Sequence, residues 1–252
     1  MDINLLEEAI TEKTKAILPI SLYGQMPDFD KLMDIAQRYQ IPVIEDGAQS
    51  FGAKQKGRYS CSITTIGVTS FFPTKPLGCY GDGGAIFTNR EDLADKIQAL
   101  RTHGASVRYE HQYVGMNGRM DTLQAAVILA KFPFFKEELI RREAVGNFYN
   151  ENLKDEFRVP KIIENNTHIF AQYVLQSDKR ELVLNKLKNQ NIAHAVYYPI
   201  CIHEQPAYSD LNYPKGSFPH AENVSKKVFS IPMHPWLEEE DQIKVIQVLK
   251  DP

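Results

Sequence analysis

One lysine, Lys75, stands in a setting that suits covalent chemistry. A β-prone run, Thr69–Phe72, comes before it, prolines stand close on both sides, and a glycine-rich turn follows. Strand ends followed by such turns are where α/β proteins place reactive groups. The apolar neighbours Phe71 and Phe72 would disfavour the charged form of the amine, as a Schiff-base lysine requires. Taken alone, the same residue also fits an ordinary solvated lysine in a surface loop.

Three further polar residues stand where strands of the predicted sheet end. Asp46 follows the apolar run 42–44, Gln49 comes three residues later, and Ser70 precedes the lysine turn. An acid can hold a cationic ring nitrogen, a hydroxyl and a backbone N–H can bind phosphate, and a lysine supplies an amine. Together these groups predict a site for pyridoxal phosphate (PLP). Each also has a structural interpretation, Asp46 as a helix cap and the other two as turn residues.

The elements that would position these residues follow from hydrophobic periodicity. Residues 15–22 are predicted to form a buried strand, 29–39 a helix capped by Asp28 or Asp30, and 42–44 a second strand. This order is a βαβ unit with a parallel sheet, in which ligands bind beyond the carboxyl ends of the strands. Further helices are expected at 92–100, at 122–131 and, after a break near Pro133, at 136–153.

Beyond residue 140 the pattern changes to that of a small α+β domain. Strands are expected at 168–175 and 195–198, and helices at 178–190, 221–229 and 238–249. We therefore predict two domains, with residues 1–140 forming part of a large PLP-binding domain and residues 141–252 forming a small C-terminal domain.

Composition narrows the function classes. The 252 residues are 43% hydrophobic and 24% charged, which is ordinary for a globular protein, and the net charge of −3 gives no argument for nucleic-acid binding. No apolar run approaches 18 residues, so we expect no membrane span. The three cysteines are far apart and predict a reducing cytoplasm. His103 and His111 have no clustered carboxylate or cysteine beside them, so no metal is expected.

Seven short motifs cover nearly the whole chain: SLYGQ (21–25), VIEDGAQSFGA (43–53), SFFPTKPLG (70–78), GDGGAIFT (81–88), LRTHG (100–104), VGMNGRMDTLQAA (114–126) and YYP (197–199). In this combination and order, the chain resembles the sugar-nucleotide aminotransferases of the DegT/DnrJ/EryC1/StrS family. The resemblance implies an α/β fold like that of fold-type-I aminotransferases. Such a fold has a large domain with a mostly parallel sheet, incomplete here at its N-terminus, and a small α+β C-terminal domain.

The resemblance also assigns roles to the residues of the cofactor site. Lys75 would bind PLP covalently and then move the proton of the substrate, while Asp46 would pair with the pyridine nitrogen. Ala48 would lie against one face of the ring, Gln49 near the ring hydroxyl, and Ser70 at the phosphate.

Four further residues receive roles from the resemblance alone. Asn117 would reach the phosphate of the neighbouring subunit's cofactor, which implies at least a homodimer with shared active sites. Arg119, Tyr197 and Tyr198 would contact the substrate. From the residues themselves, Asn117 also fits a simple turn, Arg119 a structural ion pair and Tyr197 a core aromatic.

The stretch TKPLGCYGDGGA narrows the resemblance to one branch. Pro76 stands where many family members carry Asn, and it matches the branch that aminates C3 of UDP-linked 3-keto uronic acids for O-antigen and lipopolysaccharide biosynthesis. The expected partners are a nucleotide sugar and L-glutamate. Family members begin with roughly another hundred residues, about one small domain. The resemblance therefore implies an N-terminally truncated chain with a half-built cofactor site, an open sheet edge and no assured activity of its own.

Other functions remain open at this point. A non-catalytic or regulatory homologue would bind a sugar nucleotide or a partner chain without turnover, and the expected truncation favours it. A PLP-dependent sugar dehydratase would carry histidine in place of Lys75. A nicotinamide dehydrogenase would need a G-x-G-x-x-G motif after the first strand, and the sequence has none there.

Overall fold

The computed structural model describes residues 1–251, which divide into two compact units. The first unit holds residues 1–139 and 162–171, and the second holds 140–161 and the chain from Gln172 onward. The helices are α1 (Leu6–Ala9), α2 (Phe29–Arg38), α3 (Glu91–Leu100), α4 (Thr122–Leu153), α5 (Arg180–Asn189), α6 (Pro219–Ser225) and α7 (Glu239–Lys250). The strands are β1 (Ile44–Asp46), β2 (Lys54–Gln55), β3 (Arg58–Tyr59), β4 (Ile66–Ser70), β5 (Gly84–Phe87), β6 (Ala105–Val107), β7 (Glu110–His111), β8 (Tyr173–Gln176) and β9 (Val228–Ile231).

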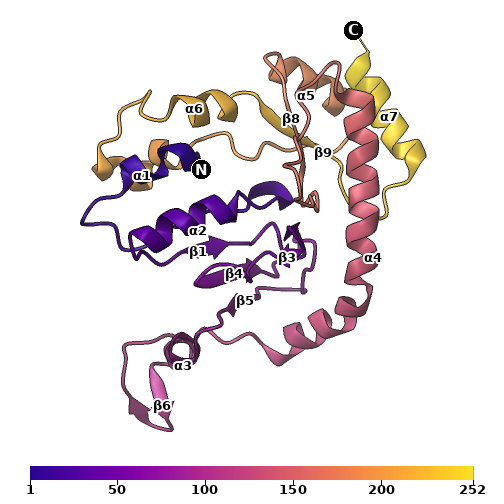
Figure 1. Ribbon diagram of the computed structural model, residues 1–252. Coiled ribbons are helices and arrows are strands. Elements are labelled where there is room, and N and C mark those ends of the chain that lie inside the picture. Colours follow the sequence, from indigo (N-terminus) through magenta and orange to yellow (C-terminus); the bar gives the residue numbers. More distant parts are fainter. Residues whose placement is uncertain (252) are drawn as a thin grey trace. The chain divides into compact units, whose positions relative to one another are not determined.

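The sheet of the first unit has the order β1–β4–β5 (Figure 1). β1 and β4 are parallel, as the βαβ prediction requires, and β5 runs antiparallel to β4. The predicted strand over 15–22 is confirmed in part, because the segment pairs with β1 in parallel and in one register, but it does not form a continuous strand. Only isolated parallel bridges, from Ile17 to Val43 and from Ile20 to Asp46, join this segment to β1. Pro19 has no N–H to give to a ladder, which explains why regular pairing does not develop there.

Helix α2 covers β1 and fixes its position in the unit. Its apolar residues recur at helical spacing, and Phe29, Leu32 and Ala36 are buried in one cluster with Val43. The helix begins as predicted, because the carboxylate of Asp28 accepts a hydrogen bond from the N–H of Lys31 at 3.3 Å. The packing of α2 therefore sets where the carboxyl end of β1 lies.

The helical assignment of α4 continues through Pro133, so the predicted interruption there is wrong, although the axis of the helix bends between its lower and upper parts (Figure 1). A proline inside a helix removes one backbone hydrogen bond and strains one turn, but packing can offset that loss. Here Ile128 and Phe135, on either side of the proline, are both buried in the core of the first unit.

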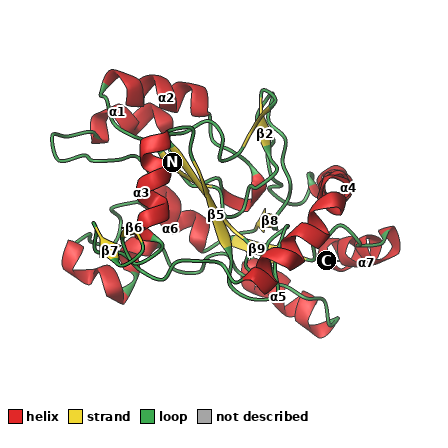
Figure 2. Cartoon of the chain, turned by 90° about the horizontal axis from the view of Figure 1, so that it is seen from below, coloured by secondary structure: helices red, strands yellow, loops and turns green. Residues whose placement is uncertain are grey.

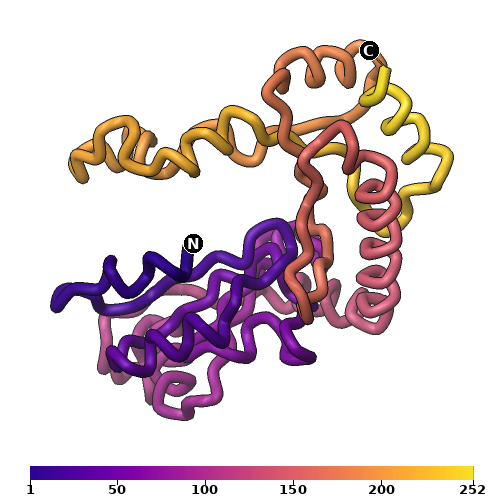
Figure 3. The backbone as a smooth tube through the Cα atoms, turned by 45° about the horizontal axis from the view of Figure 1, so that its top comes forward, coloured from indigo at the N-terminus to yellow at the C-terminus, as the bar shows by residue number. Residues whose placement is uncertain are grey.

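The segment 162–171 returns to the first unit, although the sequence analysis placed every residue after 140 in the second domain. The backbone explains the difference, because the N–H of Ile169 donates to the carbonyl of Gly24 and the N–H of Thr167 donates to that of Lys54, at 2.9 and 2.8 Å. The tube in Figure 3 shows this segment beside the indigo N-terminal part of the chain.

The second unit is built on the antiparallel pair β8–β9, with α5 and α7 as its main helices (Figure 2). Two predictions are wrong here. Residues 195–198 form only one bridge, from Ala195 to Ser230, and the expected helix 221–229 ends early because its last apolar residues form β9. Short apolar runs do not distinguish a buried strand from a helix end.

Nowhere in residues 1–251 is there a helix with the length and apolar character that a bilayer crossing needs.

Candidate active site

The carboxyl ends of β1 and β4 bring the predicted cofactor residues to one edge of the sheet. Asp46, the last residue of β1, pairs with Val68, and Ser70 ends β4 two residues further along. β5 then returns antiparallel, with Gly84 opposite Ser70, so the whole loop 71–83 lies beyond this edge. The loop carries Lys75.

Asp46 is half-buried and has one carboxylate oxygen engaged. Its Oδ1 accepts a hydrogen bond from the N–H of Ala48 at 3.0 Å. Its backbone is held on both sides, since its N–H donates to the carbonyl of Pro19 and its carbonyl accepts from the N–H of Ser21, both at 2.9 Å. The other oxygen, Oδ2, has no hydrogen-bond partner among the described residues.

The turn that carries Lys75 closes tightly on itself. The backbone N–H of Lys75 donates to the carbonyl of Phe72 at 2.8 Å, and the N–H of Cys79 donates to the carbonyl of Phe71 at 2.8 Å. A Cβ on Gly78 would lie only 2.7 Å from the carbonyl oxygen of Pro73, so only glycine fits there. The Lys75 side chain is half-buried, and its amine makes no ion pair or hydrogen bond with residues 1–251.

Ser70 and Gln49 hold backbone groups around this edge. The Ser70 hydroxyl accepts a hydrogen bond from the N–H of Phe72 at 3.2 Å, which leaves its own proton for another acceptor. The Gln49 side-chain oxygen accepts from the N–H of Tyr23 at 2.7 Å. Tyr23 has a left-handed backbone with φ of 59°, a conformation that needs such support in a non-glycine residue.

The chemical groups that these residues present match those that pyridoxal phosphate needs. A protonated ring nitrogen needs a carboxylate oxygen, and Asp46 has one without a partner among residues 1–251. A carbonyl carbon needs an amine, and the amine of the half-buried Lys75 has no ion pair among residues 1–251. Ala48 is small enough for a flat ring to approach, and Ser70 has a hydroxyl proton for phosphate. The assignment of these roles stays a prediction.

The other predicted residues lie elsewhere in the fold. Asn117 and Arg119 are exposed on the loop before α4, where the Asn117 side-chain oxygen accepts from Arg119 Nε at 3.1 Å. The backbone of Asn117 is bridged to Thr102. Tyr197 and Tyr198 belong to the second unit, and their rings meet edge to face at 5.6 Å. Within the first unit, no hydrogen bond among the described residues joins Asn117 or Arg119 to Asp46 or Lys75.

The sequence analysis missed a buried network directly behind Asp46. Glu45 is fully buried, and its carboxylate accepts hydrogen bonds from Ser21 Oγ, Ser60 Oγ and the N–H of Cys61 at 2.7, 2.6 and 2.6 Å. Burial and the negative charge of Glu45 raise the pKa of the Cys61 thiol to about 12. The alternation of side chains along a strand could have indicated the inward position of Glu45. Successive residues face opposite sides of a sheet, so Glu45 and Asp46 must point in opposite directions.

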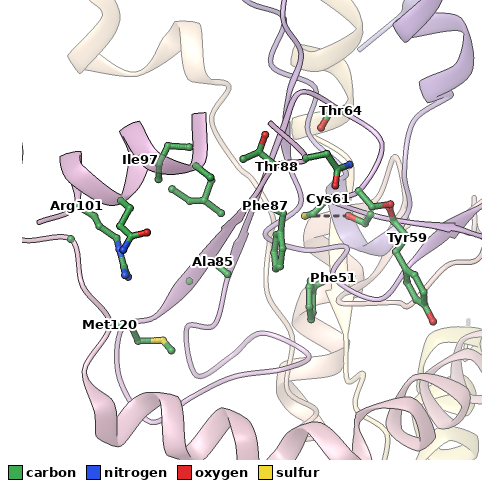
Figure 4. Close-up of a pocket in the computed structure, with 18 residues that line it drawn as sticks. Phe51, Tyr59, Cys61, Thr64, Ala85, Phe87, Thr88, Ile97, Arg101 and Met120 are labelled. Atoms are coloured by element: carbon green, nitrogen blue, oxygen red, sulfur yellow. Dashed lines mark hydrogen bonds between the residues drawn. The ribbon is translucent and has the colours of Figure 1, made fainter. Parts of the chain in front are cut away.

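A pocket of the first unit, with a volume of ≈ 740 Å³, lies away from these residues. It runs between β5, α3 and the turn 59–64, and Figure 4 shows Phe51 and Phe87 on one side with Ile97 and Arg101 on the other. Neither Asp46 nor Lys75 lines it. β5 pairs only with β4 among the described strands, and this open flank of the sheet explains the pocket.

One cluster of possible metal ligands is present in the second unit. His203, Glu204 and Glu222 each place a ligand atom within 4.8 Å of the others. Glu222 Oε1 accepts from the N–H groups of Gly216 and Phe218 and lies 3.2 Å from His203 Nε2, while Oε2 also accepts from Gly216. Burial raises the pKa of Glu222, but these hydrogen bonds outweigh it and the pKa lies below its ordinary value. We interpret this carboxylate as an anchor for the loop 202–218.

Comparison with known proteins now adds to this geometry. The sequence pattern of the DegT/DnrJ/EryC1/StrS aminotransferase family matches residues 1–250. The UDP-2-acetamido-2-deoxy-3-oxo-D-glucuronate aminotransferase of Pseudomonas aeruginosa is 50% identical over 239 residues, which are 94% of this chain and 66% of that protein. A protein of Geobacillus stearothermophilus named as a pleiotropic regulatory protein is 42% identical over 250 residues, 98% of this chain and 67% of its own length.

A solved structure shows the same fold. NtdA from Bacillus subtilis, with its bound cofactor PMP, superimposes with a TM-score of 0.90 at 31% identity, over 99% of this chain and 59% of that one. The predicted fold class is confirmed by this similarity. The chain spans about two thirds of the length of the curated relatives it matches, 66% and 67%.

Proposed function

Because the chain belongs to the DegT/DnrJ/EryC1/StrS aminotransferase family, whose members use PLP, we propose that it takes part in PLP-dependent amination of a keto sugar nucleotide. The observation that supports the proposal most directly is the edge of the sheet at which β1 and β4 end. Asp46, with one carboxylate oxygen that has no partner among residues 1–251, ends β1 there, and the loop that follows β4 at the same edge holds Lys75. The substrate class follows from the relative at 50% identity, whose name specifies a UDP-linked 3-oxo uronic acid.

The residues have separate tasks in this reaction. Bound PLP supplies an electron sink that lets the carbon bearing the amino group lose its proton. The carboxylate of Asp46 would accept a hydrogen bond from the ring N–H and keep that nitrogen protonated. The Lys75 amine would hold the cofactor and then take and return the proton at the substrate carbon. Ser70 would donate to the phosphate, and Ala48 would leave one ring face accessible.

We further propose L-glutamate as the amino donor and cytoplasmic O-antigen or lipopolysaccharide biosynthesis as the setting. Glutamate would give up its amino group as 2-oxoglutarate, and the keto carbon of the sugar would receive it. Support for a reducing compartment comes from Cys61, Cys79 and Cys201, all of which carry free thiols.

A glutamate half-reaction tests the activity directly. The chain is incubated with PLP and L-glutamate, and formation of PMP is followed by absorbance and chromatography. We expect PMP with the wild-type chain and none with Lys75→Ala, while the exposed control Lys136→Ala on α4 behaves like wild type. Addition of the UDP-linked 3-oxo uronic acid should return the PMP to PLP and give an amino sugar by mass spectrometry. Covalent PLP binding without any PMP would refute transamination.

The second candidate function is a regulatory one, favoured by the name of the 42% identical relative. Such a protein would bind PLP or a sugar nucleotide and change its association with a partner without converting either. The half-reaction above separates the two functions, because a purely regulatory protein yields no PMP at any glutamate concentration.

We also propose a homodimer in which Asn117 of one subunit completes the cofactor site of the other. Its support is the exposure of Asn117 on a loop held by the bridge to Thr102. The test mixes two inactive variants, Lys75→Ala and Asn117→Ala. If sites are shared, each hybrid dimer contains one intact site of two and recovers up to half of the wild-type activity per dimer. Mixtures that stay inactive although light scattering shows hybrid dimers would contradict sharing.

A further inference from the structure

One face of α4 lies against the turn that carries Lys75. Gln124, Ile128, Lys131 and Phe135 are spaced by four, three and four residues, so they share one face of the helix. Ile128 and Phe135 are buried in a cluster with Phe71, Leu77 and Cys79, three residues of the turn region. The apolar residues of this face therefore fix the distance between α4 and the turn.

The two polar residues of the same face bind the backbone of the turn. Lys131 Nζ donates to the carbonyl of Gly78 at 2.6 Å, and Gln124 Oε1 accepts from the N–H of Tyr80 at 2.8 Å. The Lys131 bond is charge-assisted, and such bonds are roughly twice as strong as neutral ones. Gly78 is buried, so without Lys131 its carbonyl would lose its partner away from water.

The contacts reach Lys75 through a short stretch of backbone. Gly78 packs directly on the carbonyls of Phe72 and Pro73, since a Cβ there would lie 2.8 and 2.7 Å from them. Phe72 in turn accepts the hydrogen bond from the N–H of Lys75. A shift of Gly78 therefore moves the backbone from which the Lys75 side chain starts.

We propose that Lys131 and Gln124 are positioning residues that hold the turn so that the amine of Lys75 faces the cofactor. This inference rests on the proposed function, because it concerns the same lysine. Neither residue is assigned a role by the comparisons. A displacement of about 1 Å at a reacting group is enough to cost large factors in reactivity, which is why the turn needs support from outside itself.

The test uses four variants of the full chain. Lys131→Met removes the donor and keeps the stem, and Lys131→Arg keeps a cationic donor. Gln124→Leu removes the acceptor and gives a second probe if Lys131→Met fails to fold. Lys136→Met, on an exposed position of the same helix, is the matched control.

The first measurement needs no cofactor. Hydrogen exchange of the peptide spanning 72–81 should become faster in Lys131→Met and Gln124→Leu, while peptides of α2 stay as in wild type. Lys131→Arg and Lys136→Met should keep the slow exchange. Unchanged exchange at 72–81 in both Lys131→Met and Gln124→Leu would overturn the proposal.

The second measurement titrates PLP and follows the visible absorbance of PLP bound to lysine. We expect about tenfold weaker binding in Lys131→Met, as the loss of one charge-assisted hydrogen bond implies, and recovery in Lys131→Arg. Equal binding in wild type and Lys131→Met would refute the positioning role and leave the proposed function intact. Absence of the band in wild type would instead refute the proposed function, and the exchange result would still decide the inference.

Discussion

Substitution of Glu45 is the perturbation whose effect the structure determines best. The side chain is fully buried and accepts hydrogen bonds from Ser21, Ser60 and the N–H of Cys61. Hydrogen bonds to charged groups contribute about 1.5–3 kcal/mol each, and donors left unpaired in the interior carry an extra cost. The hydroxyl of Ser60 also lies 2.7 Å from the hydroxyl of Ser50, so Ser60 can donate to Ser50 when Glu45 is removed.

From these contacts we expect Glu45→Ala to lower the free energy of unfolding by about 3–6 kcal/mol, because at least two hydrogen bonds to a carboxylate, each contributing about 1.5–3 kcal/mol, are lost. Glu45→Gln keeps an oxygen for the two serines but turns an NH₂ group toward the N–H of Cys61. One hydrogen bond is then lost and two donors meet, which should cost about 2 kcal/mol.

The assay is urea unfolding followed by far-UV circular dichroism, with Glu8→Gln as the control because Glu8 is exposed on α1. A double-mutant cycle with Ser60→Ala isolates the Glu45–Ser60 bond and should give a coupling energy of about 1–2 kcal/mol. A loss below about 0.5 kcal/mol in Glu45→Ala, within the range of ordinary surface substitutions, would refute the interpretation of this network.

Three further predictions concern the same unit. Gly47→Ala should destabilise strongly in a denaturant titration, because its Cβ would lie 2.4 Å from Cys61 Sγ, and Cys61→Ala in the same chain should restore part of the loss. The Cys61 thiol, whose pKa is raised to about 12, should resist iodoacetamide at neutral pH until the protein unfolds, and rapid labelling of the native chain would contradict this. Burial lowers the pKa of His168 from 6.5 to about 4, so stability should be full above pH 6.5 and fall by up to about 3 kcal/mol as the pH drops to 4. Unfolding curves from pH 4 to 7 measure this, and His168→Gln, which keeps an acceptor for the N–H of Phe170, should flatten the dependence.

Helices whose apolar residues recur at regular helical spacing could be predicted from the sequence. The α2 stripe from Phe29 to Ala36 and its cap at Asp28 appear in the structure as expected, and α7 lies within one residue of its predicted bounds. The failures occur where tertiary packing overrides a local rule. Pro133 stays inside α4 although Phe132 and Phe134 beside it are exposed, because Ile128 and Phe135 anchor the helix in the core on either side of the proline. The apolar end of the predicted helix 221–229 becomes β9 because it pairs with β8.

The position of the candidate site residues at one sheet edge could be predicted from the sequence, whereas the contacts that support this edge could not. Strand order alone was enough to expect Asp46, Ser70 and Lys75 at one sheet edge. The supports of this edge were not predictable, because Glu45 and Lys131 act through contacts with residues 15 and 53 positions away. Long-range hydrogen bonds of this kind leave no periodic signal in a single sequence.

The central claim is that Lys75 is the residue that binds PLP covalently. Reduction of the PLP-treated chain with cyanoborohydride, followed by peptide mapping, tests it most directly. We predict one dominant modified site at Lys75, with the label strongly reduced in Asp46→Ala and unchanged in the exposed control Lys136→Ala. A label spread over exposed lysines, with no preference for Lys75, would contradict the claim.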